Sequence, residues 1–141
     1  MKLNILVTGG VYSNQCAYSA LQFCKAAVAQ GHQISQVFFY QDAVSQASSL
    51  SVPIQDEFNA VDQWQEFNQE HKTPLVVCVS AAERRGVLNA DQAKEFGKLN
   101  SNLADCFLVE GLGALHDASL SSDRTVTVSY THLTLPTTPY V

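Results

Sequence analysis

The length of the chain, 141 residues, suits one compact domain and is too short for two ordinary ones. Hydrophobic residues make up 46% and charged residues 15%, which excludes a disordered polymer and a charge-rich coiled coil. The net charge of −5 argues against binding to a nucleic-acid backbone, because that affinity depends largely on Lys and Arg at phosphates. No apolar run reaches the roughly 20 residues of a membrane-spanning helix, and the first apolar run is too short for a signal peptide. We therefore expect a soluble, cytoplasmic protein.

The first third of the chain predicts a strand, a helix and a second strand. Residues 3–8 form a short apolar run closed by two glycines, which is typical of a strand buried on both faces. Apolar residues then recur at helical spacing, starting after Ser13 or Asn14 as N-cap and ending at Gly31. The run 34–40 predicts the second strand, and a strand-helix-strand unit favours a parallel pair.

The middle of the chain predicts a long loop, a helix and a third strand. The segment 41–53 is rich in Ser, Ala and Gln, and we expect a loop with some structure of its own. Asp56 is a suitable N-cap for a helix that extends to about His71. The apolar run 75–79 predicts the third strand, and we expect the segment 80–87 to be a loop.

The last third predicts two helices and two strands. Asn89 and Gln92 resemble a capping box that opens a short helix through Phe96. Residues 107–109 and 125–128 predict the fourth and fifth strands, with a helix between them. The complete pattern predicts an α/β fold with three αβα layers and a five-stranded, mainly parallel sheet of flavodoxin-like order 2-1-3-4-5.

This strand order also predicts where a functional crevice lies. In open parallel sheets, ligands bind outside the carboxyl ends of the strands, at the point where the strand order reverses. In the predicted order, that point lies between the first and third strands. It would bring the turn 9–12 next to the segment 78–80.

The four cysteines are Cys16, Cys24, Cys78 and Cys106, and we expect reduced thiols because the chain has no secretion signal. Cys78 is either a nucleophile at the crevice or a small buried hydrophobic residue of its strand. Cys16 lies in the first turn of the first helix, where the helix dipole can lower a thiol pKa. Cys24 and Cys106 are interpreted as structural. No Cys-x-x-Cys pair and no Cys and His at short ligand spacing are present, so no metal site is expected.

The turn at Gly9 and Gly10 follows a strand and opens a helix, so it could cradle a phosphate of a nucleotide or flavin. Neither the dinucleotide fingerprint nor the P-loop pattern is present, and a tight turn is the simpler interpretation. We therefore expect no cofactor, and a nucleotide-binding domain remains an alternative.

The end of the chain differs in composition from the rest. Residues 129–141 are rich in Thr and Pro and contain no Asp, Glu, Lys or Arg. The prolines disfavour a helix or a central strand. We expect residues 1–128 to form the domain and residues 129–141 to be a non-native, cloning-derived tail or a disordered one. The alternative is a genuine flexible C-terminus that pairs with a partner.

Several short motifs, taken in their order along the chain, resemble the DsrE/TusD family of sulfur-relay subunits. They are Val7-Thr8-Gly9-Gly10 with Tyr12, Gly31-His32, Val37-Phe38-Phe39-Tyr40, Asp56-Glu57-Phe58 with Trp64-Gln65, Cys78-Val79-Ser80-Ala81-Ala82 with Arg84-Arg85-Gly86-Val87, Ser101-Asn102-Leu103, Gly111-Leu112-Gly113-Ala114-Leu115 and Asp123-Arg124. The resemblance extends from Met1 to about Val128 and implies a DsrE-like fold. It implies that Cys78 is the persulfide-forming nucleophile. The tail after Val128 has no counterpart in the family.

The resemblance implies a sulfurtransferase that relays persulfide sulfur from a TusA-type carrier through Cys78 to a TusE-type acceptor, for 2-thiolation of the tRNA wobble uridine. It also implies TusB-like and TusC-like paralogous subunits in a heterohexamer, with no direct contact with tRNA or a membrane. Two alternatives stay open: a DsrE-type subunit of dissimilatory sulfur oxidation, and a non-catalytic structural subunit of the same kind of complex. Because Arg84 and Arg85 follow Cys78 closely in sequence, we hypothesise that they assist its thiolate electrostatically.

Overall fold

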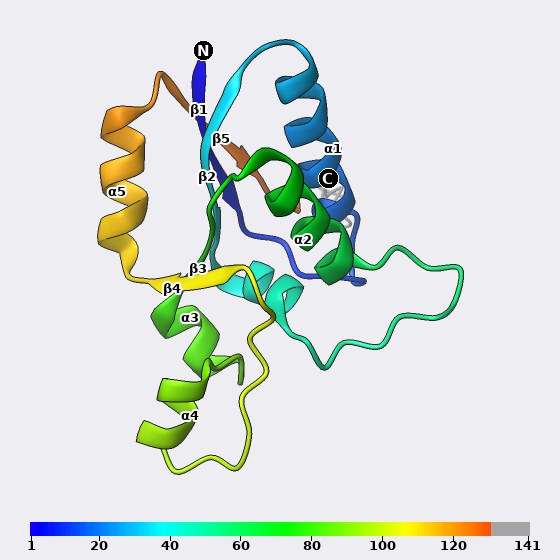
Figure 1. Cartoon of the computed structure of the whole chain (residues 1–141), viewed down its shortest axis with the longest axis vertical. Coiled ribbons are helices and arrows are strands. Elements are labelled where there is room, and N and C mark those ends of the chain that lie inside the picture. Colours follow the sequence, from blue (N-terminus) through cyan, green and yellow to red (C-terminus); the bar gives the residue numbers. More distant parts are fainter. Residues whose placement is uncertain (131–141) are drawn as a thin grey trace, which may run out of the picture.

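The structure is a computed structural model that describes residues 1–130 (Figure 1). Its strands are β1 (Lys2–Val7), β2 (Gln33–Phe39), β3 (Leu75–Cys78), β4 (Phe107–Glu110) and β5 (Arg124–Val128). Its helices are α1 (Cys16–Ala29), the 3-10 helix η1 (Gln41–Ala47), α2 (Ala60–His71), α3 (Val79–Arg84), α4 (Ala90–Glu95) and α5 (Leu112–Ser121). Most of the expected tail, residues 131–141, lies outside the described residues. Within residues 1–130, no helix combines the length and apolar composition needed to cross a bilayer.

The five strands form one parallel sheet in the order β4-β3-β2-β1-β5. The expected fold class is confirmed, but the predicted order 2-1-3-4-5 is wrong, because β2 lies between β1 and β3. The burial of β2 gives the physical reason: Phe38 and Phe39 point to opposite faces, and both are fully buried. An edge position, which the predicted order assigned to β2, would expose such a strand. The edge strands are β4 and β5, and both are less buried than β2: β4 has one buried residue, Phe107, and β5 has none.

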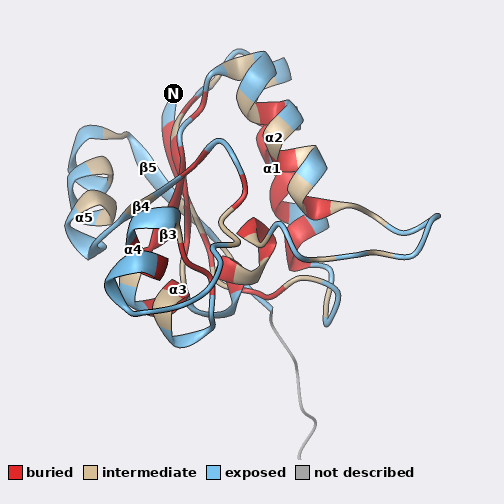
Figure 2. Cartoon of the chain, turned by 60° about the horizontal axis from the view of Figure 1, so that its bottom comes forward, coloured by how far each residue is buried: buried red, intermediate tan, exposed pale blue. Residues whose placement is uncertain are grey.

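Helices cover the two faces of the sheet unequally. The connections from β1 to β2 through α1 and from β2 to β3 through α2 cross the sheet in the same direction, so right-handed crossovers place both helices on one face. The connection from β4 to β5 through α5 runs in the opposite direction and places α5 on the other face. Figure 1 shows α5 on the opposite side of the sheet from α1 and α2, with α3 and α4 beyond the carboxyl ends of the strands. Figure 2 shows buried residues on the strands and the inner sides of α1 and α2, while α5 has none.

The core between the sheet and α2 is built from aromatic side chains. Phe39 meets Trp64 edge to face, with ring centroids 5.2 Å apart, and meets Phe107 at 5.6 Å. Trp64 continues the cluster to Phe67 at 6.1 Å. Such edge-to-face contacts add roughly 0.5–1.5 kcal/mol per pair to the free energy gained by burial. This cluster fixes α2 and η1 against the strands that end at the site described below.

Two helix starts differ from the sequence expectation. The N-cap of α1 is Gln15, and the Asn14 side chain instead accepts a hydrogen bond from the Cys16 backbone N–H at 2.8 Å. The N-cap of α2 is Asn59, which accepts from Asp62 N–H, and not Asp56. Both corrections move a boundary by one to three residues, which is the usual uncertainty of a sequence-based cap.

The segment that follows β3 is helical, so the prediction of a loop over 80–87 is wrong. Residues Ser80 to Arg84 contain no helix breaker, and Ala, Glu and Arg favour helices. Gly86, at φ +74°, then ends the turn in the left-handed conformation that favours glycine. The predicted capping box of Asn89 and Gln92 at the start of α4 is confirmed. As a result, the residue after Cys78 begins a helix instead of a loop.

Candidate functional site

Cys78 is the last residue of β3 and the N-cap residue of α3. Its side chain is only 1% exposed, and its Sγ lies 3.6 Å from the Oγ of Ser80, within hydrogen-bonding distance for sulfur. The side chain makes no capping hydrogen bond to the backbone of α3. The sequence therefore placed Cys78 correctly at the carboxyl end of the third strand, and the structure adds that its thiol is covered.

The alternation of side chains along the strands places Cys78 on the face that α5 covers. Gln36 of β2 marks this face, because its Nε2 donates to the carbonyl oxygen of Ala114 in α5 at 3.4 Å. Phe38 lies on the same face, two residues further along, and is in register with Val76 of β3. Cys78 follows Val76 by two residues and therefore also points toward the α5 side.

The neighbour of Cys78 on β4 is acidic. Cys78 is in register with Glu110, the last residue of β4, so the two side chains leave the same face of adjacent strands. Glu110 is exposed, whereas Cys78 is buried. Within residues 1–130, Glu110 takes part in no ion pair with a basic side chain. The site thus places the exposed carboxylate of Glu110 beside the covered thiol of Cys78 at the sheet edge.

The predicted meeting of the turn 9–12 with the segment 78–80 is indirect. Strand β2 separates β1 from β3, and η1 bridges the two carboxyl ends. Gln46 of η1 is fully buried, donates from Nε2 to the Gly9 carbonyl at 2.9 Å, and accepts at Oε1 from the Trp64 indole N–H at 2.8 Å. Sequence reasoning missed Gln46, although a polar residue among the apolar positions of η1 was a signal for a buried hydrogen-bond hub.

The point where the strand order reverses lies between β1 and β5, not between β1 and β3. Cys16 fills this point: its thiol donates to the carbonyl oxygen of Val128 at 3.2 Å. A Cβ on Gly9 would lie 2.4 Å from the Cβ of Cys16. Gly9 is therefore needed for close packing against Cys16, and this explains the glycine without a phosphate ligand.

The remaining thiols have contrasting environments. Burial raises the pKa of the Cys16 thiol, and hydrogen bonds from the backbones of Gly9 and Thr8 offset only part of that rise. The position of Cys16 in the first helical turn therefore does not make it an activated thiol. Burial raises the pKa of the Cys24 thiol to about 12, which fits the expected structural role. Cys106 is exposed at φ +79°, so it is not the packed structural residue that its position before a strand suggested.

All four cysteines are free thiols, as expected. Among the residues that the structure describes, no group of three or more His, Cys, Asp or Glu side chains is arranged to hold a metal ion.

The two arginines after Cys78 have different surroundings. Arg85 pairs with Asp42 of η1, with Nε 2.9 Å from Oδ1, and its Nη1 donates to the Ala81 carbonyl at 3.2 Å. Its charge is therefore already paired and joins α3 to η1. Arg84 is exposed in the last turn of α3. Within residues 1–130, Arg84 takes part in no ion pair, so its charge, unlike that of Arg85, is not already paired there.

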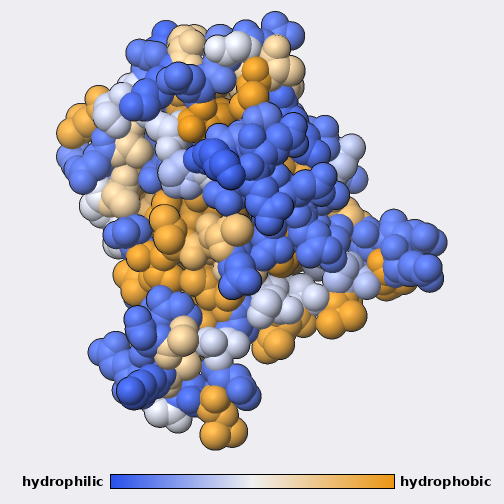
Figure 3. Space-filling model, viewed as in Figure 1, coloured by the Kyte–Doolittle hydropathy of each residue, from blue (hydrophilic) through white to orange (hydrophobic). Residues whose placement is uncertain are grey.

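An apolar groove opens on the α5 side of the sheet, next to the strand of Cys78. Its floor and walls include Pro74 and Val76 before and within β3, Leu108 of β4, and Ala114 and Ala118 of α5. Leu108 is 53% exposed. Figure 3 shows apolar surface gathered beside α5, over this edge of the sheet. No sequence pattern predicted this groove, because it depends on how little of the sheet α5 covers.

Comparisons with known proteins agree with this architecture. The model of the DsrE/DsrF-like family matches residues 1–128. Among solved structures, the chain is similar to the crystal structure of the ychN protein from E. coli, with a TM-score of 0.71. The two share 20% sequence identity, and the match covers 90% of this chain and 98% of that one. At this identity the likeness shows the fold, and it matches the three-layer parallel arrangement.

Proposed function

This chain belongs to the DsrE/DsrF-like family, and from this premise we propose that it is a TusD-type sulfur-relay subunit in which Cys78 carries sulfur as a persulfide. The observation that carries the proposal is the position of Cys78. It ends a parallel strand at the side of the sheet where such folds place their chemistry, with the Ser80 hydroxyl 3.6 Å from its sulfur. Of the four thiols, Cys16 and Cys24 have raised pKa values, and Cys106 is a lone exposed thiol on a loop.

The proposed step is a thiol exchange on sulfane sulfur. The Cys78 thiolate attacks the outer sulfur of a carrier persulfide, and a new bond forms between the Cys78 sulfur and that outer sulfur. The sulfur–sulfur bond of the carrier breaks, and its electron pair leaves on the carrier thiolate, which takes up a proton. A second thiolate, on the acceptor, then attacks the outer sulfur of the Cys78 persulfide and returns the electron pair to Cys78. No net oxidation or reduction occurs.

The local environment supports this chemistry. The Ser80 hydroxyl can donate a hydrogen bond to a thiolate or accept one from a thiol, so it can serve Cys78 both before and after transfer. The 1% exposure of Cys78 excludes water and oxidants from a stored persulfide. The same burial requires that the cover over Cys78 opens when a carrier docks.

The further roles follow the family resemblance. We propose a TusA-type carrier as donor and a TusE-type protein as acceptor, with TusB-like and TusC-like subunits in a heterohexamer in the cytoplasm. The sulfur would then enter 2-thiolation of the wobble uridine. The net charge of −5 agrees with a subunit that meets protein carriers and not tRNA itself.

The test is mass spectrometry of the protein, with its paralogous subunits, after incubation with a cysteine desulfurase, cysteine and a TusA-type carrier. We expect one added sulfur on the peptide that contains Cys78, and its loss when a TusE-type acceptor is added. A Cys78→Ser variant should gain none, whereas Cys106→Ser, which removes the exposed thiol, should gain sulfur as the wild type does. Absence of sulfur from Cys78 in a folded complex, or sulfur on Cys106 instead, would contradict the proposal.

A second candidate function is favoured by the burial of Cys78. A thiol that stays covered cannot meet a carrier, and the chain would then be a non-catalytic structural subunit. Alkylation with iodoacetamide separates the two candidates, with Cys106 as the internal exposed control. Labelling of Cys78 within the time that labels Cys106, or after addition of the carrier, favours relay. Complete protection in both conditions favours the structural role.

A further inference from the structure

We propose that the groove on the α5 face is the docking site for a cationic segment with an apolar tip, carried by the protein that exchanges sulfur with Cys78. The inference rests on the proposed function of Cys78 and names the surface and chemistry by which a partner reaches it. The groove is lined by Gln36, Pro74, Val76, Leu108, Glu110, Ala114, Asp117, Ala118 and Ser121.

The groove leads to Cys78. Val76, on its floor, lies two residues before Cys78 on the same strand and the same face. Glu110, on its wall, is the residue in register with Cys78 on β4. Because residues two apart on a strand lie about 7 Å apart, a segment seated on Val76 ends within one side-chain length of the buried thiol.

Residues 1–130 leave the apolar part of the groove uncovered. Helix α5 has no buried residue, and the strands that it contacts most are β1 and β2. Leu108 is therefore 53% exposed at the sheet edge, and Leu112 at the start of α5 is 48% exposed. Contiguous apolar surface beside a reactive residue marks an interaction site, since isolated exposed leucines would carry no such meaning.

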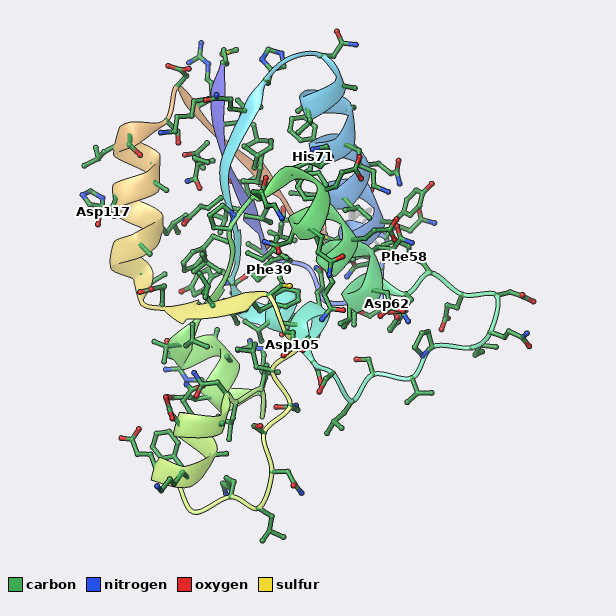
Figure 4. The ribbon with its side chains drawn as sticks, viewed as in Figure 1. Phe39, Phe58, Asp62, His71, Asp105 and Asp117 are labelled. Atoms are coloured by element: carbon green, nitrogen blue, oxygen red, sulfur yellow. The ribbon has the colours of Figure 1, made fainter. Side chains whose placement is uncertain are left out.

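The charges of the groove select the partner. Glu110 and Asp117 both line it, and its described lining contains no Lys, Arg or His. Within residues 1–130, neither carboxylate takes part in an ion pair. Figure 4 shows Asp117 on α5, across the sheet from Asp62 and His71 of α2. An apolar side chain flanked by Lys or Arg therefore complements this surface, and the net charge of −5 steers such a partner toward the protein.

The same charges argue against a second copy of this chain as the occupant. In a two-fold symmetric contact, both partners present the same patch to each other. Glu110 and Asp117 of one copy would then face acidic residues of the other, and like charges placed against each other across an interface are unfavourable. A partner with basic residues does not have this conflict.

The test compares two double variants that change the net charge equally. Glu110→Lys with Asp117→Lys reverses the groove, and Glu66→Lys with Glu70→Lys reverses two exposed acids of α2, on the opposite face. Each protein is loaded with sulfur from a TusA-type carrier persulfide and, separately, from glutathione persulfide. We expect kcat/KM with the protein carrier to fall at least about tenfold in the groove variant and less than about twofold in the α2 variant. Loading from glutathione persulfide measures the reactivity of Cys78 itself in each variant, and the change with the protein carrier is expressed relative to it.

A second variant tests the apolar contribution. Leu108→Ser removes an exposed apolar contact without changing the charge, and we expect it to weaken binding of the protein carrier at least about threefold. Binding of the carrier in its plain thiol form, measured by calorimetry, gives a readout that does not need sulfur transfer. Loss of carrier binding in Leu108→Ser and in the charge-reversed groove variant, with binding kept in the α2 variant, supports docking at the groove. If Cys78 nevertheless takes up no sulfur, the docking inference holds and only the proposed relay function fails.

Three outcomes would overturn the inference. The first is equal carrier kinetics and binding in wild type and groove variants. The second is an equal loss in the groove and α2 variants, which would mean general charge steering without a docking site. The third is dissociation from the paralogous subunits with unchanged transfer per folded chain, which would assign the groove to subunit contact.

Discussion

The guanidinium of Arg85 holds helix α3 against η1 through Asp42. The two residues are 43 positions apart in sequence, but Arg85 Nε lies 2.9 Å from Asp42 Oδ1. A second hydrogen bond, from Arg85 Nη1 to the Ala81 carbonyl, ties the same side chain to the body of α3. Because α3 begins directly after Cys78, this pair connects the surroundings of the thiol to the segment that follows β2. It acts as a surface clamp and leaves Arg85 without a free charge for Cys78.

Replacing Arg85 by Ala should lower the free energy of unfolding by less than about 1 kcal/mol, because both partners are partly solvated. Their side chains are 35% and 73% exposed for Arg85 and Asp42, respectively. A double-mutant cycle with Asp42→Ala, followed by urea unfolding at low and high salt, measures the coupling and its screening. Arg84→Ala serves as the neighbouring control. A coupling well above 1 kcal/mol that is insensitive to salt would show that the clamp is more than a surface pair.

The buried side chain of Gln46 predicts a larger effect. Gln46→Leu would leave the Gly9 carbonyl and the Trp64 indole N–H without their hydrogen-bond partner inside the core. We expect a loss of about 2–4 kcal/mol in the free energy of unfolding, since two buried polar groups become unsatisfied. Gln55→Leu, at an exposed position, should change it by less than about 0.5 kcal/mol. Chemical unfolding, followed by the fluorescence of Trp64, measures both variants. Equal losses in Gln46→Leu and Gln55→Leu would contradict the role of Gln46 as a buried hydrogen-bond partner.

Gly9 should tolerate no side chain. In Gly9→Ala the new Cβ would lie 2.4 Å from Cβ and 2.6 Å from Sγ of Cys16, so we expect a loss of about 1–3 kcal/mol from overpacking. Gly113→Ala is the matched control, because its Cβ would meet nothing within 4 Å and its backbone is helical. That change should be neutral or stabilising by up to about 1 kcal/mol. Thermal unfolding measures the stability of both variants. If Gly9→Ala is as stable as the wild type, α1 can move away from the turn at Gly9 and the close contact with Cys16 is not required.

Cys24 predicts a loss of stability at alkaline pH. Burial raises the pKa of its thiol from 9.0 to about 12, so the unfolded chain ionises first as the pH rises. The stabilising contribution is therefore fully present below pH 9.0 and is lost progressively as the pH approaches 12. Between about pH 8 and about pH 10, under reducing conditions, the wild type should lose about 1 kcal/mol more than Cys24→Ala in urea unfolding. If the wild type and Cys24→Ala lose the same free energy of unfolding over this pH range, the loss does not come from the Cys24 thiol.

We propose that the domain ends at about Val128, so a chain shortened to residues 1–130 should keep its fold. The segment removed is the Thr- and Pro-rich end identified by composition. We expect Tm to change by less than about 1 °C, since the removed segment contains two prolines and its composition disfavours a helix or a central strand. A lower Tm, or lost binding to the paralogous subunits, would instead support the alternative of a C-terminus that pairs with a partner.

Local sequence patterns predicted the elements well where the physical cause is local. The apolar run before Gly9 became β1, and the reciprocal caps of Asn89 and Gln92 formed as expected, because hydrogen bonds between near neighbours decide both. The helical turn after Cys78 was missed because its start depends on how β3 ends and not on a visible N-cap motif. The carboxyl-end position of Cys78 followed from the strand pattern alone.

The sequence by itself determined the class of the fold, the strand that carries Cys78, and the likeness to a sulfur-relay family, because periodicity and ordered motifs are properties of the chain. Only the tertiary structure decided that β2 is central and that β5 pairs with β1, that Cys16 fills the reversal point beside β1, and that Arg85 is paired with Asp42. It alone also decided that Cys78 is covered and that a groove lined by Val76 and Glu110 lies beside its strand. These features arise from packing between segments distant in sequence, whose free energies depend on the whole assembled sheet and not on any local pattern.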